Sequence, residues 1–286
     1  RLPTASQPFV LKAPCNYERL APVSILGTRV LRTEDPRFLT GTSTYTADLE
    51  DDRLTGALHA HFVRSSVPHG RIGGIDAREA RDMPGVVGVY TADDIPMLPI
   101  PPAMRPLERN FNRQPLATDI VRFVGEPVAI VLAETPAQAA DAAERVEVDI
   151  DWLDPVIDPR EALEGTTLLF PDAGTNVTVS HGSADDFDDA VFAQCDVVVS
   201  REIRNPRLAV ASMEGRAGAC FWGEDGRLTM WLSNQGAQSA KAELALHLGL
   251  RPEMVRVITP DVGGAFGAKF RADPEHSIVA AASRRA

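Results

Sequence analysis

The chain has 286 residues, of which 44% are hydrophobic and 24% charged, and its formal net charge at pH 7 is −11. Such a length accommodates about two domains with a sizeable core, and the composition is ordinary for a globular protein. The negative charge, with no compensating basic cluster, argues against a nucleic-acid-binding surface. No run of about 18 apolar residues is present that could span a membrane, and the N-terminal residues lack the continuous apolar core of a signal peptide.

The cysteines are few and widely spaced. There are three, Cys15, Cys195 and Cys220, and none forms a C-x-x-C motif. An odd number at this spacing encodes neither a disulfide framework nor a cysteine-ligated iron–sulfur cluster. The cysteine usage fits a reducing, cytoplasmic setting. It also predicts that any iron–sulfur or zinc chemistry comes from another chain.

Apolar residues, alternating or continuous, predict four strands in the first half of the chain. These strands lie at residues 54–63, 86–90, 125–133 and 146–152. Thr135 and Pro136 are typical of a helix start, so an alanine-rich helix is predicted over 137–145. One or two helical turns are expected at 77–82, and the proline-rich residues 95–118 are expected to form a long loop.

His59 and His61 lie two positions apart on the first predicted strand, and their side chains therefore face the same side. Such a pair could begin a metal site, but no third ligand follows at a suggestive spacing. Metal sites usually need three or more protein ligands. The pair is therefore interpreted as ordinary sheet residues.

Segment boundaries follow from periodicity and proline content. Residues 1–26 show little periodicity and are predicted to form an extended arm. Prolines in the region after residue 152 indicate a linker, placed at 156–175. A second domain is expected over 176–286, and its last residues look like a helix without a proper end, as if the domain were cut short.

The second domain is predicted to mix strands and helices. Strands are expected at residues 196–200, 217–222, 228–232 and 255–259, and helices at 185–193, at 237–248 and from Pro274 onward. The first helix carries four acids, which lack the spacing of a calcium loop. They are better explained as the solvated start of a helix, which acids stabilise through the helix dipole. They are Asp185, Asp186, Asp188 and Asp189.

Two loops stand out because each leaves a predicted strand and enters a helix. One is Ser233-Asn-Gln-Gly236, and the other contains Gly263-Gly-Ala-Phe-Gly267. Lys269 lacks the preceding glycine and following Ser or Thr of a phosphate-binding P-loop, and no G-x-G is present for a dinucleotide fingerprint. A tight turn between core elements remains the simple alternative for the second loop, and a helix-start turn for Gln235. As a pair, the loops predict a ligand crevice.

The motifs together resemble the molybdenum-binding large subunit of the xanthine dehydrogenase family, the molybdenum hydroxylases. Similarity extends from about Gly27 to Arg271 and is greatest to the large subunits of carbon monoxide dehydrogenase-like and aldehyde- or N-heterocycle-oxidising enzymes. The matching motifs include Arg32-Thr-Glu-Asp-Pro-Arg-Phe-Leu-Thr-Gly41, Val124-Gly-Glu-Pro-Val-Ala129, Met213-Glu-Gly-Arg216 and the two loops.

This resemblance implies an α+β fold. Residues 27–155 would form the β-rich hammerhead domain, and residues 176–286 the first part of a molybdopterin-binding domain. It also implies that Gln235 lies beside the oxo ligand of molybdenum and that Phe266 packs at the metal site, neither coordinating the metal directly. The remaining cofactor-binding residues implied are Gly236, Gly263, Gly264, Ala265 and Gly267.

The resemblance further implies a molybdopterin cofactor, often the cytosine dinucleotide form in bacteria, and an oxidoreductase that hydroxylates a carbon centre with water as oxygen source. Electrons would pass to FAD and [2Fe-2S] clusters on a medium and a small partner subunit. The pterin supplies the metal ligands in such enzymes, so the protein contributes orientation and electrostatics. The rest of the large subunit, or a complementary chain, would complete the site.

Three departures from the family pattern bear on this hypothesis. Ala265 replaces a common third glycine, and Phe270 stands where purine-oxidising members have glutamate, which favours an apolar or aromatic substrate. The family's glutamate base lies near the C-terminus of a longer subunit, and no residue here matches it. Glu214 is interpreted as structural or cofactor-supporting. The alternatives are a catalytically incomplete scaffold or assembly module and, more weakly, a nucleotide binder.

Overall fold

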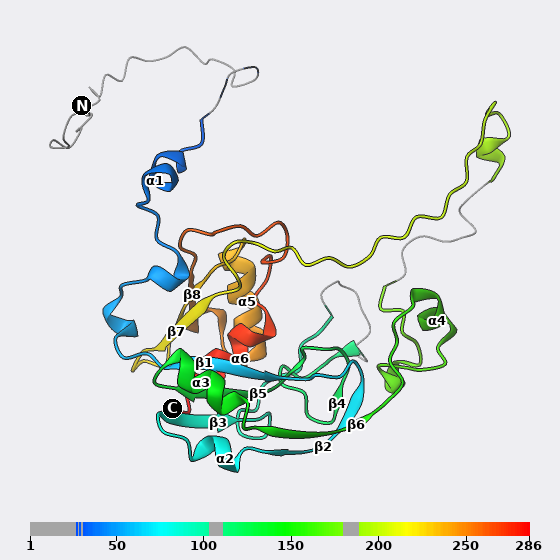
Figure 1. Ribbon diagram of the computed structural model, residues 1–286. Helices are drawn as coiled ribbons and strands as arrows, with labels where there is room; N and C mark the ends of the chain where they lie inside the picture. Colours follow the sequence, from blue (N-terminus) through cyan, green and yellow to red (C-terminus); the bar gives the residue numbers. More distant parts are fainter. Residues whose placement is uncertain (1–26, 28, 30, 103–110, 180–188) are drawn as a thin grey trace, which may run out of the picture. The chain divides into compact units, whose positions relative to one another are not determined.

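The computed structural model describes residues 27, 29, 31–102, 111–179 and 189–286 (Figure 1). The chain divides into two units, residues 1–43 and residues 44–286. The predicted arm over 1–26 lies outside the described residues. In the first unit, Pro36 lies in the first turn of the short helix α1 (Asp35–Thr40), which ends at Gly41 in the left-handed conformation and buries none of its residues.

Two antiparallel sheets form the first half of the second unit. One has the order β1-β5-β3 and the other β4-β2-β6. The strands are β1 (His59–Arg64), β2 (Gly70–Asp76), β3 (Val86–Tyr90), β4 (Ile120–Val121), β5 (Pro127–Ala133) and β6 (Glu147–Trp152). Two short helices precede β1, η1 (Thr46–Asp48) and η2 (Asp52–Leu54). Two others connect strands: α2 (Arg78–Arg81) between β2 and β3, and α3 (Pro136–Ala143) between β5 and β6.

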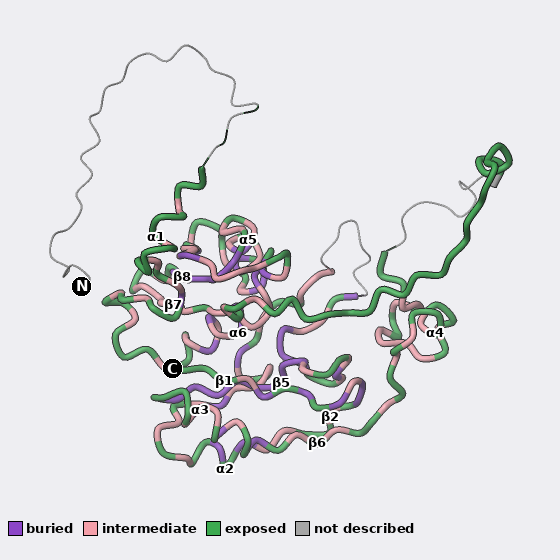
Figure 2. Tube along the Cα trace, turned by 45° about the horizontal axis from the view of Figure 1, so that its top comes forward, coloured by how far each residue is buried: buried purple, intermediate pink, exposed green. Residues whose placement is uncertain are grey.

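The central strand β5 is buried along its whole length, as Figure 2 shows, because β1 and β3 pair with its two edges and α3 packs on the sheet. The predicted start of α3 is confirmed: Thr135 Oγ1 accepts a hydrogen bond of 3.3 Å from the Gln138 amide. The predicted strand 86–90 also forms. Because β3 is an edge strand, only Val89 is buried in it.

The second half of this unit contains a three-stranded sheet of order β7-β8-β9, with α5 and α6 beside it. Its elements are β7 (Gly218–Trp222), β8 (Leu228–Leu232), α5 (Ala237–His247), η7 (Pro252–Met254), β9 (Val255–Ile258) and α6 (Pro274–Ser283). The first two strands are antiparallel and form a hairpin. The last two are parallel, with Leu228 opposite Val255 and Trp231 opposite Ile258. A buried cluster including Met230, Leu244 and Val255 joins α5 to this sheet.

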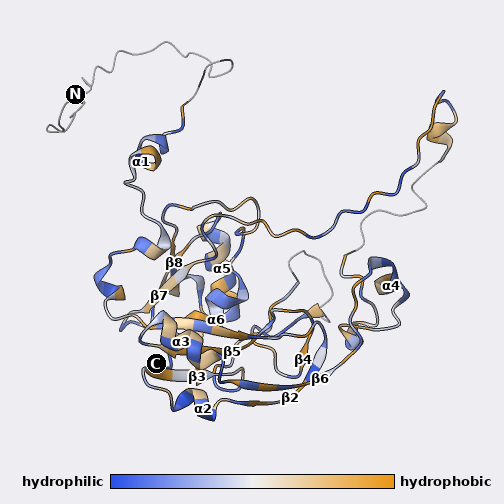
Figure 3. Ribbon diagram, viewed as in Figure 1, coloured by the Kyte–Doolittle hydropathy of each residue, from blue (hydrophilic) through white to orange (hydrophobic). Residues whose placement is uncertain are grey.

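The structure corrects one prediction and adds detail to two others. No strand forms at 196–200, since residues 190–211 are exposed throughout, and this segment has no neighbouring strand among the described residues to pair with it. Figure 3 shows both hydrophobic and hydrophilic stretches along this segment. The predicted linker contains α4 (Pro159–Glu164), capped by Asp158, and η4 (Pro171–Ala173). Of the predicted helix 185–193, residues 185–188 lie outside the described residues, and η6 (Asp189–Phe192) is a 3-10 helix.

None of the helices in the described ranges has the length and apolar character needed to cross a membrane.

The two histidines of β1, His59 and His61, line a cavity of about 890 Å³ together with Arg216 and Cys220. No cluster of three or more potential metal-ligating side chains forms among the described residues.

Candidate functional site

The parallel pair β8 and β9 places the two predicted loops at the same edge of the sheet. The first, residues 233–236, connects β8 to α5, and the second follows β9 and leads to α6. The ends of adjacent parallel strands are a common position for ligand crevices. Thr259, directly after β9, donates a hydrogen bond of 2.8 Å to the Asn234 side chain. The two loops are therefore joined close to the strands from which they leave.

Gln235 joins the loops a second time. Its backbone N–H donates to the carbonyl oxygen of Lys269 at 2.9 Å, and its side-chain Oε1 accepts from the Gly267 N–H at 3.1 Å. A backbone N–H can only donate, so the amide atom that faces Gly267 has to be oxygen. The Nε2 group of Gln235 therefore faces away from Gly267 and remains a neutral donor for a ligand.

The glycine loop presents consecutive backbone donors. Gly264, Phe266 and Gly267 adopt positive φ values of 100°, 47° and 89°. Among the described residues, no acceptor is found for the backbone N–H groups of residues 264–266. Successive unpaired amides in a turn are suited to binding an anionic or electronegative group. Phe266 itself is 80% exposed, so its ring is available for contact with a partner or ligand.

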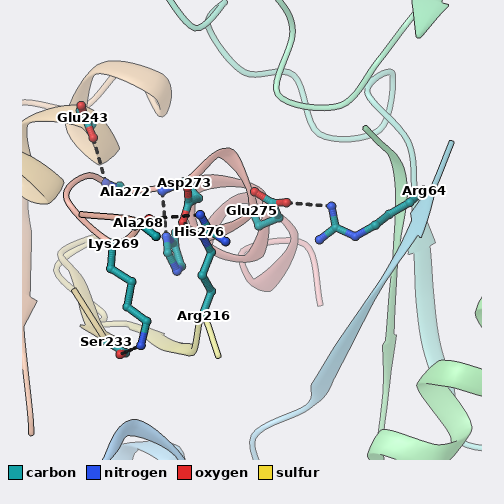
Figure 4. A network of polar contacts seen from close by, with 10 residues as sticks. All are labelled: Arg64, Arg216, Ser233, Glu243, Ala268, Lys269, Ala272, Asp273, Glu275 and His276. Atoms are coloured by element: carbon teal, nitrogen blue, oxygen red, sulfur yellow. Dashed lines mark hydrogen bonds and ion pairs between the residues drawn. The ribbon is translucent and has the colours of Figure 1, made fainter. Parts of the chain in front are cut away.

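A buried polar cluster, not recognised from the sequence as a unit, lies behind these loops. Glu214 Oε2 accepts hydrogen bonds from the Ser233 hydroxyl at 2.6 Å and the Gly263 amide at 2.7 Å. It also forms an ion pair of 3.2 Å with Lys269, whose side chain is 3% exposed. The Lys269 ammonium also donates a hydrogen bond to the hydroxyl oxygen of Ser233, at 2.7 Å, and Figure 4 shows this contact.

The ionisation of Glu214 is controlled by opposing effects. Burial raises the pKa of its carboxyl, but the hydrogen bonds from Ser233 and Gly263 and the adjacent Lys269 ammonium outweigh burial and lower the pKa below its usual value. Glu214 is therefore a carboxylate at neutral pH. Its second oxygen, Oε1, is buried and has no hydrogen-bond partner among the described residues.

Further contacts fix the far end of the glycine loop. Arg216 donates to the Ala268 carbonyl at 3.1 Å and pairs with Asp273 at 2.5 Å. The Ala272 amide donates to Glu243 of α5 at 2.9 Å. Figure 4 shows these residues around the start of α6. Hydrogen bonds and ion pairs thus attach the loop to the segment just before β7, to the end of β8 and to α5.

The predicted site residues differ in their surroundings. Gln235 and Gly267 are in direct contact, and Gly236 is the N-cap residue of α5. Gly263 lies against Glu214, and a Cβ atom added there would be 2.6 Å from the Glu214 Cβ. Phe270 is half exposed, and its carbonyl accepts a hydrogen bond from Ser239.

The donor set fits an anionic cofactor held mainly by backbone. Three free amides and the Gln235 Nε2 group can donate to oxygen or sulfur acceptors without adding charge. The buried acceptor Glu214 Oε1 is left for a donor that the described residues do not supply. A molybdopterin, which carries its own metal ligands and a phosphate, is compatible with these groups.

Comparison with known families locates these features in two recognised domains. The model described as "Aldehyde oxidase and xanthine dehydrogenase, a/b hammerhead domain" matches residues 40–154, and the "Molybdopterin cofactor-binding domain" model matches residues 169–286. The chain is therefore a hammerhead domain followed by the start of a molybdopterin-binding domain. This confirms the predicted α+β fold class.

Relatives agree with this assignment. The chain is 38% identical over 274 residues to the nicotine 6-hydroxylase large subunit of Paenarthrobacter nicotinovorans, covering 91% of this chain and 32% of that protein. It is 31% identical to the carbon monoxide dehydrogenase large chain of Hydrogenophaga pseudoflava, covering 96% and 36% respectively. The crystal structure of quinoline 2-oxidoreductase from Pseudomonas putida 86 matches with a TM-score of 0.78 at 30% identity, covering 91% of this chain and 33% of that one.

The chain belongs to the molybdenum hydroxylase large-subunit family, which includes xanthine dehydrogenase, carbon monoxide dehydrogenase and aldehyde oxidoreductase subunits. It spans about a third of the length of each of the three proteins compared above. The domain boundaries at 155/156 and 175/176, and the roles of the individual site residues, stay predictions.

Proposed function

We propose that this chain forms part of an oxidoreductase that hydroxylates a carbon centre, of an aldehyde, an N-heterocycle or a similar compound, with water as the oxygen source. The observation that carries the proposal is the direct contact between Gln235 Oε1 and the Gly267 amide at 3.1 Å. Because this contact holds the Gln235 side chain against the glycine loop, its Nε2 group lies close to the free amides of that loop, and together they form one set of donors. The match of residues 169–286 to a molybdopterin cofactor-binding domain supports molybdopterin as the group that these donors would hold.

When bound, the molybdenum cofactor supplies the redox chemistry of the hydroxylation. Gln235 would donate from Nε2 to an acceptor atom of the cofactor, without bringing a competing charge. The amides of Gly264, Ala265 and Phe266 would donate in the same direction and stabilise negative charge that develops there. Gly236 and Gly263 would let the backbone approach, and the exposed Phe266 ring would cover the cofactor and exclude water from it.

For the cofactor form we propose the cytosine dinucleotide of molybdopterin, and for the electron acceptors [2Fe-2S] clusters and FAD on partner subunits. Relatives named as large subunits, and one named as a subunit of a dehydrogenase complex, support a hetero-oligomer. The sparse cysteines support a cytoplasmic location. Phe270, half exposed beside the glycine loop, favours an apolar or aromatic substrate other than a purine.

The proposal is tested on the complete enzyme by metal analysis, pterin extraction and turnover of N-heterocycles and aldehydes, first for the native protein and then for Gln235→Ala. Because Gln235 is exposed in this chain, the substitution should cost at most about 1 kcal/mol of stability, the net value of one hydrogen bond. Removal of a donor to developing charge lowers kcat by about 100-fold or more. Gln238→Ala, an exposed glutamine in the first turn of α5, is the matched control and should leave kcat unchanged.

Two results would contradict this function. An assembled, active complex that contains no molybdenum would remove the cofactor assignment. Equal losses of stability and turnover in Gln235→Ala would remove the chemical role of Gln235. A complete complex that binds neither molybdenum nor pterin and turns over nothing would instead support the scaffold alternative.

A further inference from the structure

We propose that Glu214 is a positioning residue, which together with Lys269 sets the geometry between the Gln235 loop and the glycine loop. This inference rests on the proposed function, because it concerns the same donor set. Glu214 would not act on the substrate or the cofactor itself. It would act through the two loops that carry the donors.

Glu214 contacts both loops with a single oxygen atom. Ser233, whose hydroxyl donates to Oε2 at 2.6 Å, lies two residues before Gln235. Gly263, whose amide donates at 2.7 Å, opens the glycine loop. The Glu214 amide donates back to the Gly263 carbonyl at 3.1 Å, so the start of the loop is held by two hydrogen bonds.

Lys269 closes this arrangement into a ring. Its ammonium contacts Glu214 at 3.2 Å and Ser233 at 2.7 Å, while its backbone carbonyl accepts the Gln235 N–H at 2.9 Å. Gln235 in turn accepts from Gly267. Any shift of the Lys269 side chain is therefore transmitted through its backbone to Gln235 and the glycine loop.

The chemistry of the pair favours positioning over stability. A buried ion pair is often no more stabilising than apolar residues of similar size, because both charges lose their hydration. The pair does, however, constrain direction and distance, since Oε2 receives three donors from two separate loops. The buried Oε1 has no donor among the described residues, so Glu214 is not fully satisfied by these segments alone.

The test uses the complete, cofactor-loaded enzyme with Glu214→Gln, Lys269→Met and the double variant. Each single change leaves one buried charge without its partner and shifts the loops. We expect kcat per bound molybdenum to fall about 10- to 100-fold, as a displacement of about 1 Å does, with KM changed less than about threefold. The double variant should recover most of this loss, because no unpaired charge remains.

Two further measurements separate positioning from a general loss of stability. Amide hydrogen exchange should accelerate in peptides covering residues 262–272 in the single variants and return towards the native rate in the double variant. The control Leu244→Ala removes a fully buried side chain of the same sheet and helix core. It should lower the melting temperature at least as much as the single variants do while keeping kcat per molybdenum within about twofold of native.

The inference is overturned by either of two results. Single variants with native kcat per molybdenum would show that the pair does not position the donors. A loss of kcat per molybdenum in Leu244→Ala equal to that in Glu214→Gln would show a stability effect only. Both results presuppose a native enzyme that contains molybdenum and turns over, so they are distinct from a failure of the proposed function.

Discussion

The closest backbone approach in the site gives a quantitative prediction for Gly263→Ala. The added Cβ atom would lie 2.6 Å from the Glu214 Cβ and 3.4 Å from its backbone nitrogen. Unstrained carbon atoms stay about 3.5–4.0 Å apart, so the two segments would have to separate by about 1 Å. The Gly263 N–H···Oε2 hydrogen bond of 2.7 Å would then be broken.

The expected cost combines overpacking, about 1–3 kcal/mol, with a hydrogen bond to a charged group, about 1.5–3 kcal/mol. The two costs are not fully additive, because moving the segments apart relieves the overpacking but breaks the hydrogen bond. The net loss of stability should therefore be about 3 kcal/mol. For a domain of 150–250 residues, this lowers the melting temperature by about 6–12 °C. Thermal unfolding of the complete subunit, followed together with its molybdenum content, measures both consequences.

Two neighbouring glycines serve as matched controls for this prediction. Gly215 has open space around its Cβ position, and its φ lies outside the left-handed region, so Gly215→Ala should be neutral or slightly stabilising. Gly267 also has open space but a φ of 89°, and Gly267→Ala should cost about 1–2 kcal/mol from backbone strain alone. If Gly263→Ala melts at the same temperature as Gly215→Ala, the close packing of Glu214 against the loop is refuted.

The remaining predictions concern buried titratable groups. Burial, with a smaller effect from Arg113, lowers the pKa of His247 from 6.5 to about 4. The unfolded chain then binds the proton more strongly than the folded chain does. The free energy of unfolding should therefore fall by up to about 3 kcal/mol as the pH is lowered from about 6.5 to 4. Urea unfolding of the His247→Gln variant over the same pH range should not show this decrease. Burial also raises the pKa of the Cys220 thiol, and Cys220 is only partly exposed whereas Cys195 is exposed. Iodoacetamide should therefore modify Cys195 faster than Cys220 in the native protein, as peptide mass mapping would show, and equal rates for the two thiols would contradict this difference.

The sequence was sufficient to predict the loops of the site because local signals mark them. Glycine and proline end the helices, and apolar alternation marks β8 and β9, so both loops could be placed after strands. Their proximity also followed, once the two strands were taken as neighbours, from the rule for strand ends in parallel sheets. The contact of Gln235 with Gly267 could not be predicted in this way, because it depends on side-chain direction between residues 32 positions apart.

The Glu214 cluster could not be predicted as a unit for a related reason. Glu214 meets Ser233 across 19 positions and Lys269 across 55, and no spacing rule connects residues on separate segments. The strand predicted at 196–200 was wrong for a different reason, because local propensity alone does not make a strand. Its valines have strong strand propensity, but a strand also needs a partner to accept its hydrogen bonds. Among the described residues no such partner lies beside it, and the segment stays exposed.

The hammerhead and molybdopterin-binding regions are separate in sequence but share a core. Ile278 and Ala282 of α6 lie in one buried cluster with Ile130 and Leu132 of β5. Arg64 of β1 also pairs with Glu275, at the start of α6, at 2.8 Å, as Figure 4 shows. Since α6 begins directly after the glycine loop, the hammerhead sheet fixes the far end of that loop. The position of Phe266 thus depends on packing in both regions, although the residues that bind the cofactor are all predicted in the second.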